Sequence, residues 1–150
     1  WLPKNIPDDD ETSIVHGDYR LDNMILKDNQ VMGILDWELS TLGHPIADFS
    51  YHCLSWRTQE AFWDQSKLKE LGIPNEREYM DMYCENTGKD LSKNWEFYMA
   101  FNMFKIAGIL QGILGRVRDG TASSKHAEDR GMMVYPLSEA AWNTIKENLL

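Results

Sequence analysis

The chain has 150 residues and a formal net charge of −9, because 15 Lys and Arg side chains face 24 Asp and Glu side chains. This acidity argues against a protein that coats nucleic acid, since phosphate contacts require basic patches. Hydrophobic residues make up 43% of the chain, enough for a packed core, which excludes wholesale disorder. The length suits one domain or a large part of one.

The first third of the chain is expected to contain short strands. Residues 1–13 are predicted to be an approach segment, because two prolines and the acidic run 8–11 deny it a stable interior. Residues 14–15 are predicted to form a very short strand that leads into His16. Two apolar runs, 23–26 and 31–35, flank polar turn residues and predict a β-hairpin. This hairpin would bring Asn23 close to Asp36.

The run from His16 to Asp36 has the spacing of a phosphoryl-transfer site. The catalytic loop of protein kinases reads H-R-D-x-x-x-x-N and is followed by a metal-binding Asp at a later strand end. Here Gly17 replaces the Arg, and the rest of the pattern is kept. Asp18 is therefore the candidate base for the proton of an acceptor hydroxyl. Asn23 and Asp36 are candidate oxygen ligands for Mg²⁺, which prefers hard oxygen donors.

Two further residues of this run have expected roles. Arg20 follows Asp18 by two residues, where its charge can offset that of a transferring phosphoryl group. His16 is expected to hold the loop backbone by hydrogen bonding rather than to do chemistry. Taken singly, such residues are more often turn, cap or surface residues. Their combination with a strand pair and an Asp at its end favours the functional interpretation.

The rest of the chain is predicted to be helical. After a loop over residues 37–45, a helix is expected with Pro45 in its first turn. Further helices are expected over residues 59–71, over 75–87 with Asn75 as cap and Gly88 beyond the end, from Ser92 to about Arg118, and over 136–149. The predicted fold class is therefore α+β and mostly helical, as a single unit over residues 1–150.

Other features of the sequence support limited expectations. Gly108, Gly112 and Gly115 share one helical face, which we interpret as a smooth surface for close packing of a neighbouring helix. A phosphate-binding loop is disfavoured there, because neither a preceding strand nor a G-x-G-x-x-G pattern is present. The apolar stretch 97–114 is interrupted by polar residues and is predicted to fall short of a membrane span. Cys53 and Cys84 are interpreted as reduced thiols of a cytoplasmic protein.

Residues 16–23, 34–38 and 43–48 carry a family resemblance. They resemble the aminoglycoside phosphotransferase and choline kinase family of protein-kinase-like enzymes. A narrower similarity, carried by residues 36–43, 98–112 and 120–124, is to the kinase-like domains fused to, or encoded beside, acyl-CoA dehydrogenases.

The resemblance implies the C-terminal lobe of a kinase-like fold, with ATP as co-substrate and Mg²⁺ as cofactor. It implies that Asp18 is the catalytic Asp, that Asn23 and Asp36 are metal ligands, and that Asp48 is a structural carboxylate holding the loop backbone. A complete enzyme of this type also has an N-terminal lobe with a loop over the phosphates and a strand Lys. Thirteen residues before Ile14 cannot build that lobe, so the 150 residues alone are expected to be inactive.

The first hypothesis is therefore a phosphotransferase acting on the hydroxyl of a small molecule, such as a hydroxyacyl-CoA, an amino alcohol or an aminoglycoside. Its acceptor site is expected among the helices after Pro45, where cationic residues either hold an anionic acceptor or are ordinary solvated charge; they are Arg116, Arg118, Lys125, His126 and Arg130. A non-catalytic pseudokinase or interaction module is the second hypothesis, and the intact Asp18, Asn23 and Asp36 count against it. A metal-dependent phosphatase is the third, disfavoured because no further His or Asp cluster suggests a two-metal site.

Overall fold

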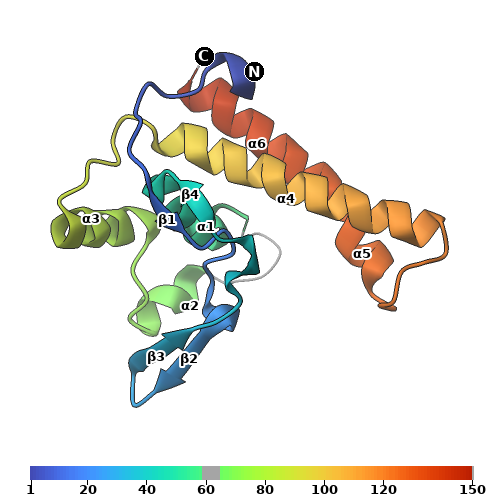
Figure 1. Cartoon of the computed structure of the whole chain (residues 1–150), viewed down its shortest axis with the longest axis horizontal. Coiled ribbons are helices and arrows are strands. Elements are labelled where there is room, and N and C mark those ends of the chain that lie inside the picture. Colours follow the sequence, from blue (N-terminus) through green and yellow to red (C-terminus); the bar gives the residue numbers. More distant parts are fainter. Residues whose placement is uncertain (59–64, 150) are drawn as a thin grey trace.

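The computed structural model describes residues 1–58 and 65–149 and is mostly helical, with two small antiparallel sheets. The long helices α4 and α6 lie side by side, α5 lies near their far end, and the hairpin of β2 and β3 projects from the opposite side of the molecule (Figure 1). The elements in chain order are η1 (Leu2–Lys4), β1 (Ser13–Val15), η2 (Leu21–Asn23), β2 (Met24–Lys27), β3 (Gln30–Ile34), η3 (Trp37–Leu39), β4 (Thr41–Gly43), α1 (Pro45–Arg57), α2 (Gln65–Glu70), α3 (Glu76–Thr87), α4 (Trp95–Arg118), α5 (Ala127–Met132) and α6 (Val134–Asn148).

The predicted hairpin is confirmed. β2 and β3 pair in antiparallel register, with Met24 opposite Ile34 and Lys27 opposite Gln30. Its two-residue turn is Asp28-Asn29, and both residues have positive φ, 50° and 60°. These angles match the turn type whose twist suits a tight hairpin, and Asn and Asp tolerate them better than other side chains do. The local sequence therefore accounts for this element.

A second sheet was not expected from the sequence. Residues 37–45 are predicted to be a loop, but Thr41–Gly43 forms β4, which pairs antiparallel with β1. The partners are Ser13 with Gly43 and Val15 with Thr41, far apart in the chain. A three-residue strand leaves almost no local pattern, because its hydrogen bonds come from a distant segment. This sheet places the residues after β1 directly beside the start of α1.

The core lies where α1 crosses α4. Ile46, Phe49 and Cys53 of α1 are buried, and Asn102 of α4 is 1% exposed. The Asn102 amide donates hydrogen bonds to the carbonyl oxygen of Ala47 at 2.9 Å and to the Ser50 hydroxyl at 2.8 Å. Buried polar groups cost free energy unless they are paired, so these bonds fix the relative position of the two helices.

The helix boundaries agree with the sequence in part. The Asn75 cap is confirmed: Asn75 and Glu78 form a capping box, and Gly88 ends α3 with φ 71°. The long helix starts at Trp95 with Asn94 at its N-cap, so the expected cap at Ser92 is wrong. The Ser92 backbone N–H instead donates to the Asp90 carboxylate at 2.8 Å, which holds a turn there. Helix α5 was not predicted, and of the helix predicted over 59–71, residues 59–64 lie outside the described residues.

Two expectations concern α4. By length and composition α4 is long and apolar enough to cross a membrane, although its polar residues predicted that it would fall short. Its buried residues, which include Trp95, Met99 and Met103, make it the central helix of the core, and core helices of globular proteins often pass the same test. The Gly108, Gly112 and Gly115 face is also not closely packed: within the described residues, a Cβ at any of them would meet nothing within 4 Å.

The open glycine face supports a stability prediction. Gly108→Ala and Gly112→Ala should each raise the free energy of unfolding by about 0.5–1 kcal/mol, because Ala loses less backbone entropy and meets no obstacle. Gly131→Ala is the matched control: its Cβ would lie 2.6 Å from Leu114 side-chain atoms and should destabilise. Urea unfolding measures all three variants, and a loss of stability in the first two would contradict the open face.

Candidate active site

The loop of residues 16–23, called here the 16–23 loop, is held from α1. The backbone N–H groups of His16 and Gly17 donate to the two carboxylate oxygens of Asp48, the Gly17 bond being 2.8 Å long. Pro45 starts α1, so Asp48 lies in its first turn and faces the loop at the end of β1. An anchored carboxylate that accepts two backbone bonds fixes the path of the chain at this point.

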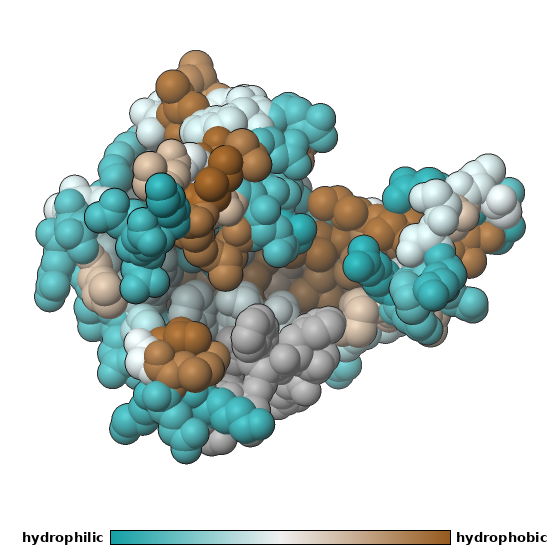
Figure 2. All heavy atoms as spheres, turned by 90° about the horizontal axis from the view of Figure 1, so that it is seen from below, coloured by the Kyte–Doolittle hydropathy of each residue, from teal (hydrophilic) through white to brown (hydrophobic). Residues whose placement is uncertain are grey.

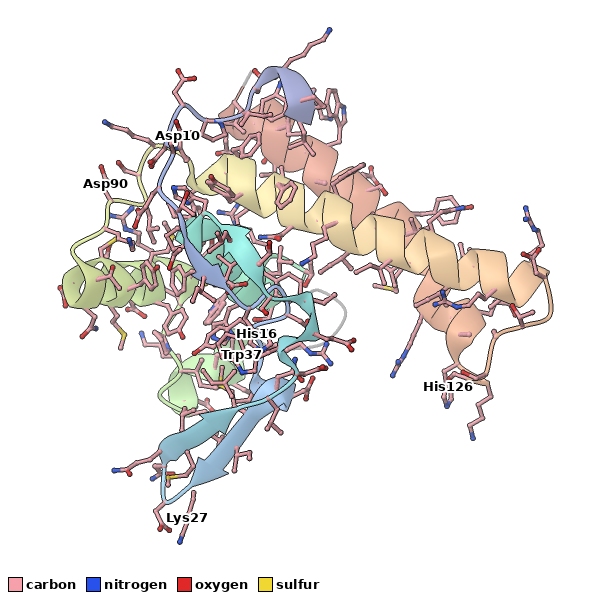
Figure 3. All side chains as sticks on the ribbon, in the orientation of Figure 1. Asp10, His16, Lys27, Trp37, Asp90 and His126 are labelled. Carbon is pink, nitrogen blue, oxygen red and sulfur yellow. The ribbon has the colours of Figure 1, made fainter. Side chains whose placement is uncertain are left out.

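His16 joins this loop to the end of the hairpin. Its side chain is buried, with Nε2 2.7 Å from the carbonyl oxygen of Leu35 and Nδ1 3.2 Å from the backbone nitrogen of Asp18. A carbonyl can only accept and a backbone N–H can only donate, so the ring must be neutral with its proton on Nε2. His16 and Trp37 lie together where the loop meets the hairpin, with ring centroids 4.7 Å apart (Figure 3).

Gly17 occupies a position that only glycine fits. Its φ is 85°, in the left-handed region, and an added Cβ would lie 2.6 Å from the carbonyl oxygen of Leu39. We expect Gly17→Ala to lower the free energy of unfolding by about 3 kcal/mol, because backbone strain adds to a backbone clash. Gly88→Ala is the control: its φ of 71° is similar, but no described atom lies within 4 Å, so it should cost about 1 kcal/mol. Denaturant unfolding measures both variants. Equal losses of free energy of unfolding in Gly17→Ala and Gly88→Ala would contradict a clash with Leu39.

Asp18 has both of its carboxylate oxygens bound while the side chain stays 24% exposed. The Tyr51 hydroxyl donates to Oδ1 at 2.6 Å, and the Asn23 amide donates to Oδ2 at 3.0 Å and to the Asp18 carbonyl oxygen at 2.9 Å. Arg20 is more distant, with Nε 3.8 Å from Oδ2, and its guanidinium also pairs with Asp22 at 3.1 Å on the surface. Asp18 is therefore oriented from two sides and remains accessible to a ligand.

The hairpin brings the backbone of Asn23 next to the end of β3. The Leu35 N–H donates to the Asn23 carbonyl oxygen at 2.8 Å, and Asp36 follows with φ 65° as an exposed residue at the start of η3. The Asn23 amide nitrogen is engaged by Asp18, which leaves the amide oxygen for another partner. Among the described residues no three His, Cys, Asp or Glu side chains form a metal cage. One amide and one carboxylate oxygen suit Mg²⁺, which keeps waters and takes its other ligands from phosphates.

Two residues at this site, Tyr51 and Lys105, lie outside the sequence motif. Tyr51 follows Asp48 by one helical turn, and Lys105 comes from the middle of α4. The Lys105 ammonium donates to the Gly17 carbonyl oxygen at 2.5 Å and stands 4.9 Å from the centroid of the Tyr51 ring. The only sequence clue for Tyr51 is that it shares a helical face with Asp48. Nothing local marks Lys105, because its partners lie far away in the chain.

The cationic residues considered for an anionic acceptor lie elsewhere. They are found at the C-terminal end of α4 and around α5, and His126 is far from His16 (Figure 3). All five side chains, Arg116, Arg118, Lys125, His126 and Arg130, are exposed. The structure therefore does not bring this cluster to Asp18.

Apolar surface also lies apart from Asp18. A pocket of about 730 Å³ is lined by residues of the N-terminal segment, α4 and α6, including Trp1, Phe101, Phe104 and Trp142, and by none of the candidate site residues. The end of α4, the start of α6 and α5 together project from the body of the molecule, and Figure 2 shows further apolar surface between the body and the polar tip of this projection. A smaller pocket of about 300 Å³ lies beside the 16–23 loop, and Tyr19 and Asp48 contribute to its wall.

The mostly helical fold, with a short hairpin beside an anchored His-Gly-Asp loop, defines the class of kinase-like phosphotransferases. The model of the phosphotransferase enzyme family matches residues 1–83, and the chain belongs to this family. A crystal structure of a putative aminoglycoside phosphotransferase from Ralstonia eutropha JMP134 matches with a TM-score of 0.88 and 49% identity, over 98% of this chain and 47% of that chain. The predicted family and fold class are confirmed.

The chain is also similar to part of several longer curated proteins. Acyl-CoA dehydrogenase family member 10 of Mus musculus is 43% identical over an alignment of 150 residues that covers 95% of this chain and 14% of that protein. Acyl-CoA dehydrogenase family member 11 of Homo sapiens is 40% identical over an alignment of 146 residues that covers 93% of this chain and 19% of that protein. The similarity is to the kinase-like domain of these proteins. The chain spans less than a fifth of the length of each.

Proposed function

We propose that the protein is an ATP- and Mg²⁺-dependent phosphotransferase that moves a γ-phosphoryl group to the hydroxyl of a small molecule. The observation that carries this proposal is the geometry of Asp18, whose carboxylate is oriented by Tyr51 and Asn23 yet remains partly exposed. Phosphoryl transfer demands little covalent chemistry, so a positioned base and charge neutralisation suffice. Among the described residues, Asp18 is the carboxylate that accepts from both a tyrosine hydroxyl and an asparagine amide within the 16–23 loop.

Each residue has a defined part in the proposed reaction. Asp18 accepts the proton of the acceptor hydroxyl, because each of its oxygens keeps a free lone pair after binding Tyr51 or Asn23. The Asn23 amide oxygen and the Asp36 carboxylate would hold Mg²⁺. When bound, this ion neutralises charge on the phosphates. Arg20 is exposed, and its guanidinium would turn from Asp22 toward the transferring group.

The proposed acceptor is a hydroxyacyl-CoA-type compound, with amino alcohols and aminoglycosides as alternatives. The support comes from relatives that carry an acyl-CoA dehydrogenase name, and the structural match to a putative aminoglycoside phosphotransferase is the reason to keep the alternatives. We further propose that polypeptide outside these 150 residues supplies the lobe that covers ATP. The small share of each relative and of the matched crystal structure that the chain spans supports this proposal.

The proposal is tested on the full-length protein with ATP, Mg²⁺ and a panel of the three acceptor classes. ADP release is measured with and without each acceptor, and mass spectrometry identifies the phosphorylated product. Acceptor-dependent ADP release that stops on addition of EDTA is the expected result. ATP hydrolysis at a rate that no acceptor changes would indicate a hydrolase, and nucleotide binding without turnover would indicate a pseudokinase. Either result contradicts the proposal.

A further inference from the structure

We infer that Tyr51 and Lys105 are positioning residues that together hold Asp18 in its reactive orientation. This inference rests on the proposed function and extends it to two residues outside the sequence motif. Tyr51 contacts the carboxylate itself, and Lys105 contacts both the Tyr51 ring and the backbone next to Asp18. The three groups come from α1, α4 and the 16–23 loop, so the arrangement exists only in the folded chain.

Tyr51 controls one oxygen of the carboxylate. Its hydroxyl donates to Oδ1 of Asp18 at 2.6 Å, whereas Asn23 binds Oδ2, so the plane of the carboxylate cannot rotate without losing a bond. Burial of the phenol, followed by its bond to Asp18 and the nearby negative charge, raises the pKa of Tyr51 far above its ordinary value. The phenol therefore stays protonated at neutral pH and donates to Oδ1.

Lys105 holds the loop from α4, whereas Asp48 holds it from α1. Its ammonium donates to the Gly17 carbonyl oxygen, while Asp48 accepts from the Gly17 N–H, so the peptide groups flanking Gly17 are held by α4 and by α1. The same ammonium faces the Tyr51 ring, an attractive contact between a cation and an aromatic face. Within residues 1–58 and 65–149 no carboxylate forms an ion pair with Lys105. Its ammonium instead interacts with the Gly17 carbonyl oxygen and the Tyr51 ring.

The packing around this arrangement makes it rigid. Asn102 lies three residues before Lys105 and bonds to Ala47 and Ser50 of α1, so the α4 backbone at Lys105 is fixed relative to the α1 backbone at Tyr51. Asp48, on the same face of α1 as Tyr51, holds the loop backbone. A reacting group must stay within a fraction of an ångström of its productive position, and small misplacements cost large factors in rate. Tyr51 and Lys105 meet this requirement for Asp18.

The test uses Tyr51→Phe in the full-length protein with its phosphoryl acceptor. We expect kcat to fall about tenfold, because a hydrogen bond to a charged group is lost, while KM for ATP and the thermal unfolding midpoint stay unchanged. Tyr83→Phe is the matched control. Tyr83 is a partly buried tyrosine that stacks on Phe49, and no hydrogen bond from its hydroxyl occurs within the described residues. Its kcat should match the wild type.

Lys105 is tested by a conservative pair. Lys105→Met should lower kcat about tenfold without raising KM for ATP, and Lys105→Arg should restore most of the rate, since a guanidinium can also donate to a carbonyl and face an aromatic ring. An unchanged kcat in Tyr51→Phe, or a loss accompanied by a lower unfolding midpoint, overturns the inference and leaves the proposed function standing. A wild type that consumes no ATP with any acceptor overturns the proposed function, and the inference with it.

Discussion

Replacing Asp18 by asparagine should lower acceptor-dependent ATP consumption by about 10²–10⁴-fold, the range that a general base contributes. Asn has nearly the same shape and can still accept from the Tyr51 hydroxyl, but it cannot take up the proton of the acceptor. KM for ATP should change little, because Asp18 contacts the acceptor rather than the nucleotide in the proposed reaction. ADP release at saturating acceptor measures the loss, and thermal unfolding verifies that the variant is folded.

Asp28→Asn provides the control for this change. Asp28 is exposed at the tip of the hairpin and has a positive φ that Asn also tolerates, so the same chemical substitution is made without touching the 16–23 loop. Its rate should match that of the wild type. An Asp18→Asn variant that retains more than about a tenth of the wild-type rate would rule out Asp18 as the base.

Replacing Arg57 by methionine should lower the free energy of unfolding by about 2–3 kcal/mol, because hydrogen bonds between charged groups in a partly buried cluster are lost. The Arg57 guanidinium binds Glu76 through Nε and Nη2 at 2.7–2.9 Å and Glu96 through Nη1 and Nη2 at 2.8 Å. These bonds join the end of α1 to the first turns of α3 and α4. Without Arg57, two carboxylates that are only 20% and 24% exposed would face each other without a cation between them, and the Trp95 indole N–H would still donate to Glu76 at 2.8 Å.

Arg57 stays protonated in the folded protein. Burial disfavours the charged guanidinium, but hydrogen bonds to Glu96 and Glu76 and their negative charges outweigh this and raise the pKa of Arg57. The pair therefore persists throughout the pH range in which both Glu side chains are ionised.

Urea unfolding with linear extrapolation measures the Arg57 effect. Arg77→Met is the control, because Arg77 forms an i,i+4 pair with Asp81 at the surface and is 76% exposed; it should change stability by less than about 0.5 kcal/mol. Adding Glu76→Gln and Glu96→Gln to Arg57→Met should recover part of the loss, since no unpaired charge then remains. A loss in Arg57→Met no larger than that of the control would contradict the role of this cluster.

Several features of the fold could be predicted because their causes are local. The Asp28-Asn29 turn selects a tight hairpin, Pro45 starts a helix, and Asn75 with Glu78 caps another. The spacing of Asp18, Asn23 and Asp36 is also a local pattern, and a hairpin between Asn23 and Asp36 explains why residues separated in sequence approach in space. The family assignment followed from these same short segments.

Other features depended on partners far away in the chain. β4 exists because β1 lies beside it, and the Gly108, Gly112 and Gly115 face is open because no described element packs there. The cationic residues at the end of α4 were assigned to the acceptor site because of their charge. They lie far from Asp18 because α4 is long and they are at its C-terminal end. Tyr51 reaches Asp18, and Lys105 reaches Gly17, from two helices whose crossing is held by the hydrogen bonds of Asn102.

The sequence by itself determined the family, the candidate base and the candidate metal ligands, since turn chemistry and motif spacing act over a few residues. The tertiary structure alone decided which side chains orient that base and which charges stay distant. The physical reason is that hydrogen bonds and packing between elements depend on where helices cross, and that crossing is set by buried contacts summed over the whole core rather than by any local pattern.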